Sequence, residues 1–147
     1  MDSGQWTVDS GQWIMDSGQW TVDNGQWTMR ENVVKNKSFA FALRIVKLYK
    51  ILSEEKREYI MSKQLLRSGT AIGALIREAE HAESKADFIH KMAIALKEAN
   101  ETEYWIELLF QSEYLDESSY QSILGDGKAL LKLLISIVKS SKENGKR

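Results

Sequence analysis

Two short motifs contain the residue types that could bind a metal. Glu78 and His81 stand three positions apart, and Asp87 and His90 repeat this spacing. In helical bundles, two Glu-x-x-His motifs and a glutamate from each of two other helices form a di-iron site. Here both motifs flank the same segment, 82–84, and the expected first helix has no carboxylate on its apolar stripe. We therefore expect a solvated, charged corner, and neither a metal nor another cofactor.

Other catalytic patterns are also missing from the sequence. The chain has no cysteine and two histidines, and no serine–histidine–aspartate arrangement can be read from it. It contains no glycine-rich phosphate loop of the nucleotide-binding types. We therefore expect that the protein is not an enzyme, and we assign no catalytic residue.

Basic residues give the strongest indication of a binding function. They form a stripe on the second expected helix, away from its apolar stripe, and they recur along the first. Aligned bases can hold phosphates through charge-assisted hydrogen bonds. The alternative is a solvated face neutralised by nearby glutamates. The residues expected to contact nucleic acid are Lys47, Lys50, Lys63, Arg67 and Arg77.

The net charge of −1 conceals an uneven distribution. The four acids of residues 1–29 have no basic counterpart there, so residues 30–147 hold all 20 Lys and Arg but only 17 of the 21 acids. The resulting balance of +3 for residues 30–147 permits contact with nucleic acid. This net charge is well below that of a strongly basic domain, for which the charge alone would indicate such contact.

Helical periodicity organises the chain after residue 36. Apolar residues recur at alternating spacings of three and four in segments near 38–53 and 55–81, in a third from Ser84, and in a fourth from Asp116 or Ser118. Long helices joined by short loops pack as antiparallel neighbours. We predict an all-α fold, an antiparallel up-down-up-down four-helix bundle with a non-helical, low-complexity N-terminal tail.

Small residues crowd the middle of the second expected helix. Glycine weakens a helix, so its presence there indicates that another element approaches closely. That element is either another helix of the same bundle or a neighbouring subunit. The residues assigned to this oligomer or helix-packing patch are Ser68, Gly69, Gly73 and Ala74.

A tandem repeat precedes the helices. A heptapeptide of the form Asp-Ser/Asn-Gly-Gln-Trp-Thr/Ile-Val/Met occurs four times before residue 30. Glycine and aspartate argue against a coiled coil despite the period of seven. We predict a mostly disordered tail, with short strands joined by turns such as Asn24-Gly25 as the alternative. Residues 1–29 are then the tail and 30–147 the bundle domain.

Composition excludes several cellular environments. The absence of cysteine suits a reducing compartment. No apolar stretch reaches the length of a membrane span, and the acidic N-terminus does not resemble a signal peptide. We expect a cytoplasmic protein without membrane contact.

Two stretches, SGTAIGALIREAEHAESKADF and ETEYWIELL, resemble the bacterial four-helix bundle protein family of 23S rRNA intervening sequences. The resemblance covers about residues 30–145 and excludes the tandem repeat. It also extends to the accessory variability protein of diversity-generating retroelements. This resemblance implies a four-helix bundle and a homo-oligomer, a pentamer as in that relative. It implies RNA or a reverse transcriptase-like protein as partner.

We therefore expect an accessory or scaffold protein that contacts structured RNA, or a nucleic-acid–protein complex, through basic helix faces. The alternative is a pure protein–protein interaction module that forms a homo-oligomer.

Overall fold

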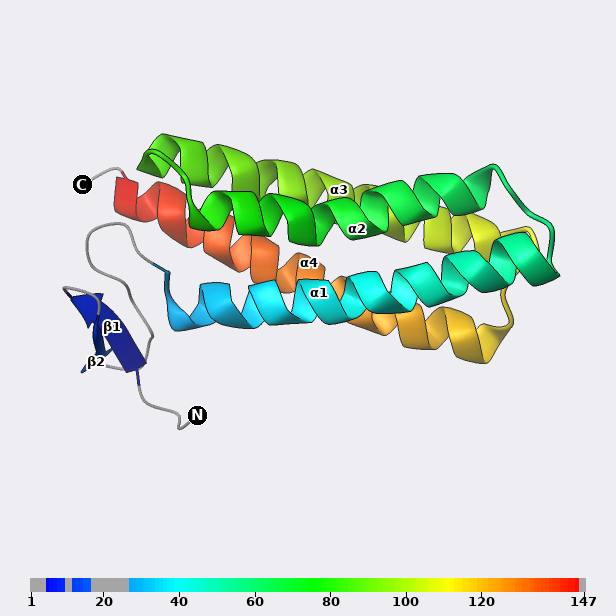
Figure 1. Cartoon of the computed structure of the whole chain (residues 1–147), viewed down its shortest axis with the longest axis horizontal. Helices are drawn as coiled ribbons and strands as arrows, with labels where there is room; N and C mark the ends of the chain where they lie inside the picture. Colours follow the sequence, from blue (N-terminus) through cyan, green and yellow to red (C-terminus); the bar gives the residue numbers. More distant parts are fainter. Residues whose placement is uncertain (1–4, 10–11, 17–26, 146–147) are drawn as a thin grey trace.

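The computed structural model describes residues 5–9, 12–16 and 27–145. Its four α-helices are α1 (Met29–Lys50), α2 (Met61–Glu80), α3 (Lys85–Gln111) and α4 (Glu117–Gly145). Successive helices run in opposite directions along the long axis, so α1 begins at the end of the bundle where α4 ends (Figure 1). The predicted all-α four-helix bundle is confirmed.

Two short strands within the tandem repeat pair with each other. Strand β1 (Gln5–Asp9) pairs in antiparallel fashion with β2 (Gln12–Asp16), in a register that places Gln5 opposite Asp16. This arrangement matches the short-strand alternative for the tail. The predicted turn at Asn24-Gly25 lies outside the described residues.

Helix α1 begins earlier than its apolar stripe predicts, because a capping box starts it. The Glu31 amide donates to Thr28 Oγ1 at 3.0 Å, and the Thr28 amide donates to Glu31 Oε1 at 2.9 Å. Trp27, 7% exposed, packs edge-on against Phe88 with ring centroids 6.0 Å apart. The predicted start near residue 38 is too late, and the last repeat unit supplies a cap and a core side chain. The division at residue 30 stays a prediction.

The corner between α1 and α2 is built around one carboxylate. A π-helix, η2 (Ile51–Glu55), follows α1, and Arg57 then adopts a left-handed φ of 56°. The Glu58 carboxylate accepts hydrogen bonds from three successive backbone amides, those of Ile60, Met61 and Ser62, at 3.1, 3.0 and 2.7 Å. These bonds satisfy donors that a helix start leaves unpaired. Helix α2 therefore begins at Met61, and the predicted start at 55 is too early.

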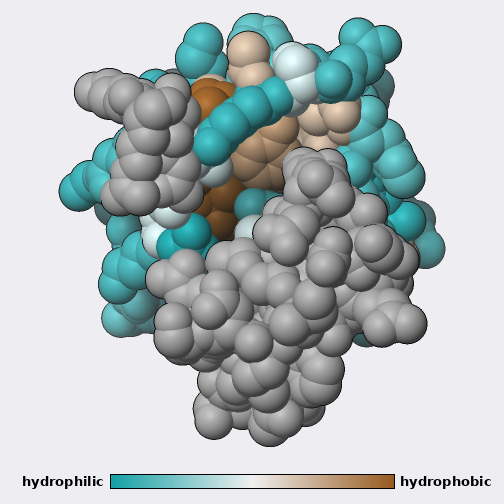
Figure 2. Space-filling view, turned by 90° about the vertical axis from the view of Figure 1, so that its left-hand side faces the viewer, coloured by the Kyte–Doolittle hydropathy of each residue, from teal (hydrophilic) through white to brown (hydrophobic). Residues whose placement is uncertain are grey.

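The core runs along the bundle axis. Helix α3 follows the predicted alternation of three and four closely: Met92, Ala95, Ala99, Thr102, Ile106 and Leu109 are buried. On α1, Ala42 and Tyr49 have the same spacing from the buried Ile45 but are only half-buried. Hydrophobic side chains also show at the end of the bundle where α1 begins, within a hydrophilic rim (Figure 2). In the part of the chain that is described, no helix combines the length and apolarity that membrane crossing demands. The buried residues of α1 are Glu31, Val34, Ser38, Phe41 and Ile45.

Helices α1 and α2 approach closely at a glycine. A Cβ atom on Gly69 would lie 2.8 Å from Cγ1 and 2.9 Å from Cγ2 of Ile45, which is fully buried. One residue earlier, the Ser68 hydroxyl accepts a hydrogen bond at 2.9 Å from Thr102 on α3. The small residues of α2 thus bring both neighbouring helices close to its backbone.

We expect Gly69→Ala to destabilise the protein by about 1–3 kcal/mol, because the added methyl group overpacks a well-filled core. The matched control is Gly125→Ala on α4, where a Cβ meets nothing within 4 Å. That change should stabilise the protein by roughly 0.5–1 kcal/mol, the usual gain from replacing a helical glycine. Urea denaturation measures both values. Equal stabilisation by the two substitutions would refute the close contact.

The corner carboxylate makes stability depend on pH. Burial opposes ionisation, but the three amide donors together hold the pKa of Glu58 below its ordinary value. Such a group stabilises the fold above its unfolded-state pKa, and the contribution disappears as the pH falls through the folded-state pKa. We expect Glu58→Gln to lower the free energy of unfolding by about 1 kcal/mol at pH 7. The deficit, measured by urea denaturation, should shrink in acid.

Glu31→Gln is a control in which the pH dependence of stability should have the opposite sign to that of Glu58→Gln. Burial raises the pKa of Glu31, although hydrogen bonds from Thr28 act against the increase. The fold therefore disfavours its ionised form, and glutamine preserves the capping box. Relative to the wild type, Glu31→Gln should gain stability as the pH rises through the folded-state pKa of Glu31. If both glutamine variants showed the same pH profile, the electrostatic assignment of the two caps would be wrong.

Candidate functional site

Helix α1 has a strong excess of basic over acidic residues. Between Met29 and Lys50 it has six basic residues and one acidic residue. Two of the bases pair with other helices: Lys35 with Glu80 and Arg44 with Asp126, both at 2.6 Å. Lys47 and Lys50 are exposed, and among the described residues no carboxylate forms an ion pair with either. These two predicted residues are therefore available to a ligand.

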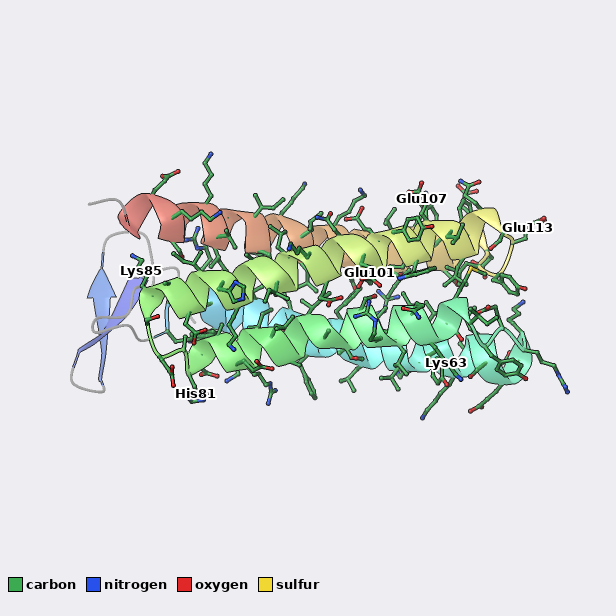
Figure 3. All side chains as sticks on the ribbon, turned by 90° about the horizontal axis from the view of Figure 1, so that it is seen from above. Lys63, His81, Lys85, Glu101, Glu107 and Glu113 are labelled. Atoms are coloured by element: carbon green, nitrogen blue, oxygen red, sulfur yellow. The ribbon has the colours of Figure 1, made fainter. Side chains whose placement is uncertain are left out.

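The three predicted bases of α2 lie in different environments. Lys63 is exposed near the start of the helix, at the opposite end from His81 (Figure 3). Arg77 is exposed, with its guanidinium carbon 5.2 Å from the ring centroid of Phe39 on α1. This contact places a cation over an aromatic face and joins the outer surfaces of α1 and α2. Lys63 and Arg77 remain open to solvent.

Arg67 is held by two carboxylates of α3. One guanidinium nitrogen lies 3.2 Å from Glu98 Oε1, and the other donates to Glu101 Oε2. Glu101 Oε2 also accepts a hydrogen bond from the Trp105 indole at 2.9 Å. The hydrogen bond to Glu101 raises the pKa of Arg67, and the same bond lowers the pKa of Glu101. Arg67 thus links α2 to α3, and its charge is largely neutralised in place.

The small-residue patch is used mainly inside the bundle. Ser68 and Gly69 are buried against α3 and α1, and a Cβ on Gly73 would lie 3.3 Å from Ser38 Oγ. Ala74 is exposed. The helix-packing interpretation therefore accounts for Ser68, Gly69 and Gly73 without a neighbouring subunit.

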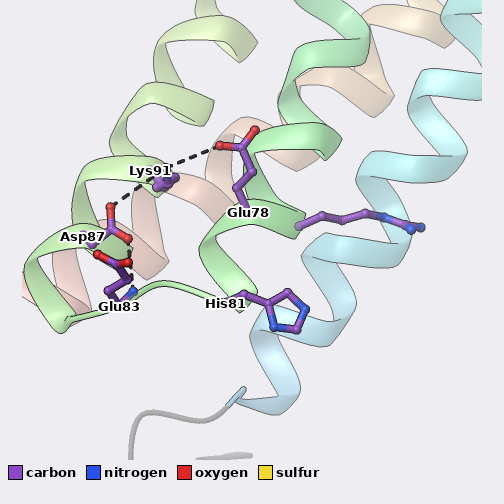
Figure 4. Close-up of a pocket in the computed structure, with 6 residues that line it drawn as sticks. Glu78, His81, Glu83, Asp87 and Lys91 are labelled. Carbon is purple, nitrogen blue, oxygen red and sulfur yellow. Dashed lines mark hydrogen bonds and ion pairs between the residues drawn. The ribbon is translucent and has the colours of Figure 1, made fainter.

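The histidine corner between α2 and α3 is an open, charged depression of about 640 Å³. Lys91 bridges it, with its amine 3.4 Å from Glu78 Oε1 and 3.9 Å from Asp87 Oδ1 (Figure 4). His81 projects away from these three side chains, and His90 is exposed. Among the described residues, no group of three histidine or acidic side chains has a metal-binding arrangement. The corner has the geometry of ion pairs exposed to solvent.

Sequence reasoning missed two exposed apolar residues on α1. Phe39 and Leu43 lie one helical turn apart on α1 and are 51% and 52% exposed. Their spacing of four was available in the sequence. The apolar stripe predicted for this helix runs through other residues.

Known proteins resemble the helical part of this chain. Residues 30–136 match the family described as 23S rRNA-intervening sequence protein. A crystal structure of a protein of unknown function from the S23 ribosomal protein family of Bacteroides thetaiotaomicron VPI-5482 is similar, with a TM-score of 0.74 and 63% sequence identity. That match covers 76% of this chain and 99% of the other. No curated protein matches. The chain belongs to the 23S rRNA-intervening sequence protein family.

Proposed function

We propose that this protein is a non-enzymatic scaffold that contacts structured RNA through the exposed basic surface of α1 and the start of α2. The observation that carries the proposal is the charge of α1, which has six bases and one acid. Lys47, Lys50 and Lys63 define the basic surface as we use the term here. The family description refers to 23S rRNA, which makes structured ribosomal RNA the first RNA to test.

Phosphate contacts should make binding sensitive to salt, because each neutralised phosphate releases condensed counterions. We expect the Lys47→Ala, Lys50→Ala, Lys63→Ala triple variant to bind a structured rRNA fragment at least about tenfold more weakly at low salt. The slope of log affinity against log salt should fall by roughly one per lysine removed. Fluorescence anisotropy at several salt concentrations measures both quantities.

The matched control removes three exposed lysines of α4: Lys132, Lys139 and Lys142. It has the same change in net charge as the first variant, so a specific surface predicts a smaller loss of affinity. Arg67→Ala should weaken the α2–α3 contact but leave RNA affinity close to the wild-type value, since Glu98 and Glu101 already neutralise this residue. Equal losses in the two lysine variants, or binding that does not respond to salt, would contradict the proposal.

A second candidate function is self-association, which the exposure of Phe39 and Leu43 favours. Large apolar side chains grouped on a soluble surface are typical of interaction sites. Charge distribution supports the same assignment, because α3 has five acids and three bases and so complements the basic α1. The pentamer implied by the family resemblance is one assembly of this kind.

We expect light scattering to give a mass above the 16.9 kDa of one chain, and Phe39→Ser with Leu43→Ser to bring it down to that value. The control is Ile135→Ser, which removes an exposed isoleucine from α4. Serine at these positions leaves the core intact, so unfolding should not obscure the result. A wild-type protein that scatters as a single chain would eliminate this candidate.

A further inference from the structure

Two hollows meet between α1 and α4, at the end of the bundle opposite the start of α1. The first, which we name the aromatic hollow, measures about 580 Å³. Leu48 and Ile51 line it from α1 and η2, Phe110 lines it from the end of α3, and Tyr114 lines it from the connection between α3 and α4. Phe110 is stacked on Tyr120 with ring centroids 3.9 Å apart and an interplanar angle of 4°, so this wall is held in place. The hollow is large enough for a planar aromatic group.

The second, which we name the cationic hollow, measures about 410 Å³. Arg44 and Lys47 line it from α1, and the hydroxyl-bearing Ser118 and Ser122 line it from α4. The two hollows share Leu48, Ile51 and Ser119, so they are contiguous. One end of the combined groove therefore offers aromatic and apolar surface, and the other offers cations and hydroxyl groups.

Arg44 is oriented but remains accessible. Its Nη2 donates to Ser122 Oγ at 2.9 Å, and its Nη1 donates to the Ser122 carbonyl at 3.3 Å and to Asp126 Oδ2 at 2.6 Å. The side chains of Arg44 and Asp126 are 41% and 53% exposed. An ion pair this exposed contributes little to stability, so an incoming anion can replace the Asp126 carboxylate.

We propose that the combined groove binds an unpaired nucleotide of RNA, with its base in the aromatic hollow and its phosphate at Arg44 and Lys47. This inference rests on the proposed function, because it specifies what the basic surface recognises. Unpaired bases of RNA typically stack on aromatic side chains, while arginine and lysine hold the neighbouring phosphate.

The remaining charges of the groove fit the same ligand. Lys56 lies at the aromatic hollow, beside Asp116 and Glu113, and Figure 3 shows Glu113 at this end of the bundle. Carboxylates at the rim repel phosphate but accept hydrogen bonds from the exocyclic amino groups of a base. Asp116 also accepts a hydrogen bond from the Ser119 amide at 2.7 Å. The first turn of α4 is thus already capped, and the anion position depends on the α1 side chains.

The experiment compares two RNAs of equal length, a hairpin with an unpaired loop and a fully paired duplex. We expect the wild type to bind the hairpin at least about tenfold more tightly, a difference of roughly 1.4 kcal/mol. Ser119→Leu places a bulky side chain where the hollows join, without changing any charge. It should remove the preference for the hairpin and leave duplex affinity unchanged, while the melting temperature confirms that the variant is folded.

The Arg44–Asp126 ion pair provides a second measurement. Asp126→Asn frees Arg44 and should tighten hairpin binding several-fold, and this gain should vanish when Arg44→Ala is combined with it. Glu107→Gln, at an exposed carboxylate of α3, controls for the general loss of one negative charge. Equal gains in Asp126→Asn and Glu107→Gln would overturn the assignment of the phosphate position.

The outcomes separate this inference from the proposed function. Salt-sensitive binding of both RNAs with equal affinity, unaffected by Ser119→Leu, would overturn the nucleotide site and preserve the basic surface. Binding of neither RNA would overturn both. A hairpin preference that Ser119→Leu abolishes would support both.

Discussion

Helices α1 and α2 touch at Gly69, where even a methyl group would collide with the buried Ile45. This contact determines how the rest of α1 is presented. Because one side of the helix lies tightly against the α2 backbone, Phe39, Leu43, Lys47 and Lys50 lie outside this packed side and are exposed to solvent. The Arg77–Phe39 contact bridges the two helices on their outer surface. The exposed surface of α1 thus follows from a packing constraint inside the bundle.

The sequence predicted the fold class, and it predicted best where periodicity is unbroken. The α3 stripe continues for six turns with buried residues at nearly every expected position. The start of α1 was missed because residues 30–37 are largely polar, and their helix depends on a capping threonine within the repeat. The start of α2 was placed too early because Tyr59 and Ile60 look like helix residues, although Glu58 turns the chain before them. Local hydrogen bonds, rather than apolar spacing, decided both boundaries.

The sequence predicts which basic residues belong to the candidate site, but it does not predict which of them are free of ion pairs. Lysine and arginine spacing predicted exposed bases on α1 and α2, and Lys47, Lys50 and Lys63 are exposed. Whether a base is free depends on carboxylates that arrive from other helices, as Glu98 and Glu101 do at Arg67. The groove between α1 and α4 was beyond sequence reasoning for the same reason, since Arg44 and Ser122 are 78 positions apart in the chain. Binding experiments should therefore substitute the basic residues that form ion pairs and those that form none in separate variants.

The junction between the repeat and α1 has a consequence for how the gene can vary. Trp27 and Thr28, which fill the core and cap the helix, belong to the fourth heptapeptide. The third unit contains the same Trp-Thr pair at positions 20 and 21. Deleting the fourth unit would therefore bring an identical pair to the same place before Arg30. Loss of the fourth unit alone would thus keep a tryptophan for the core and a threonine for the cap, and it would replace only Met29, the first residue of α1, by valine.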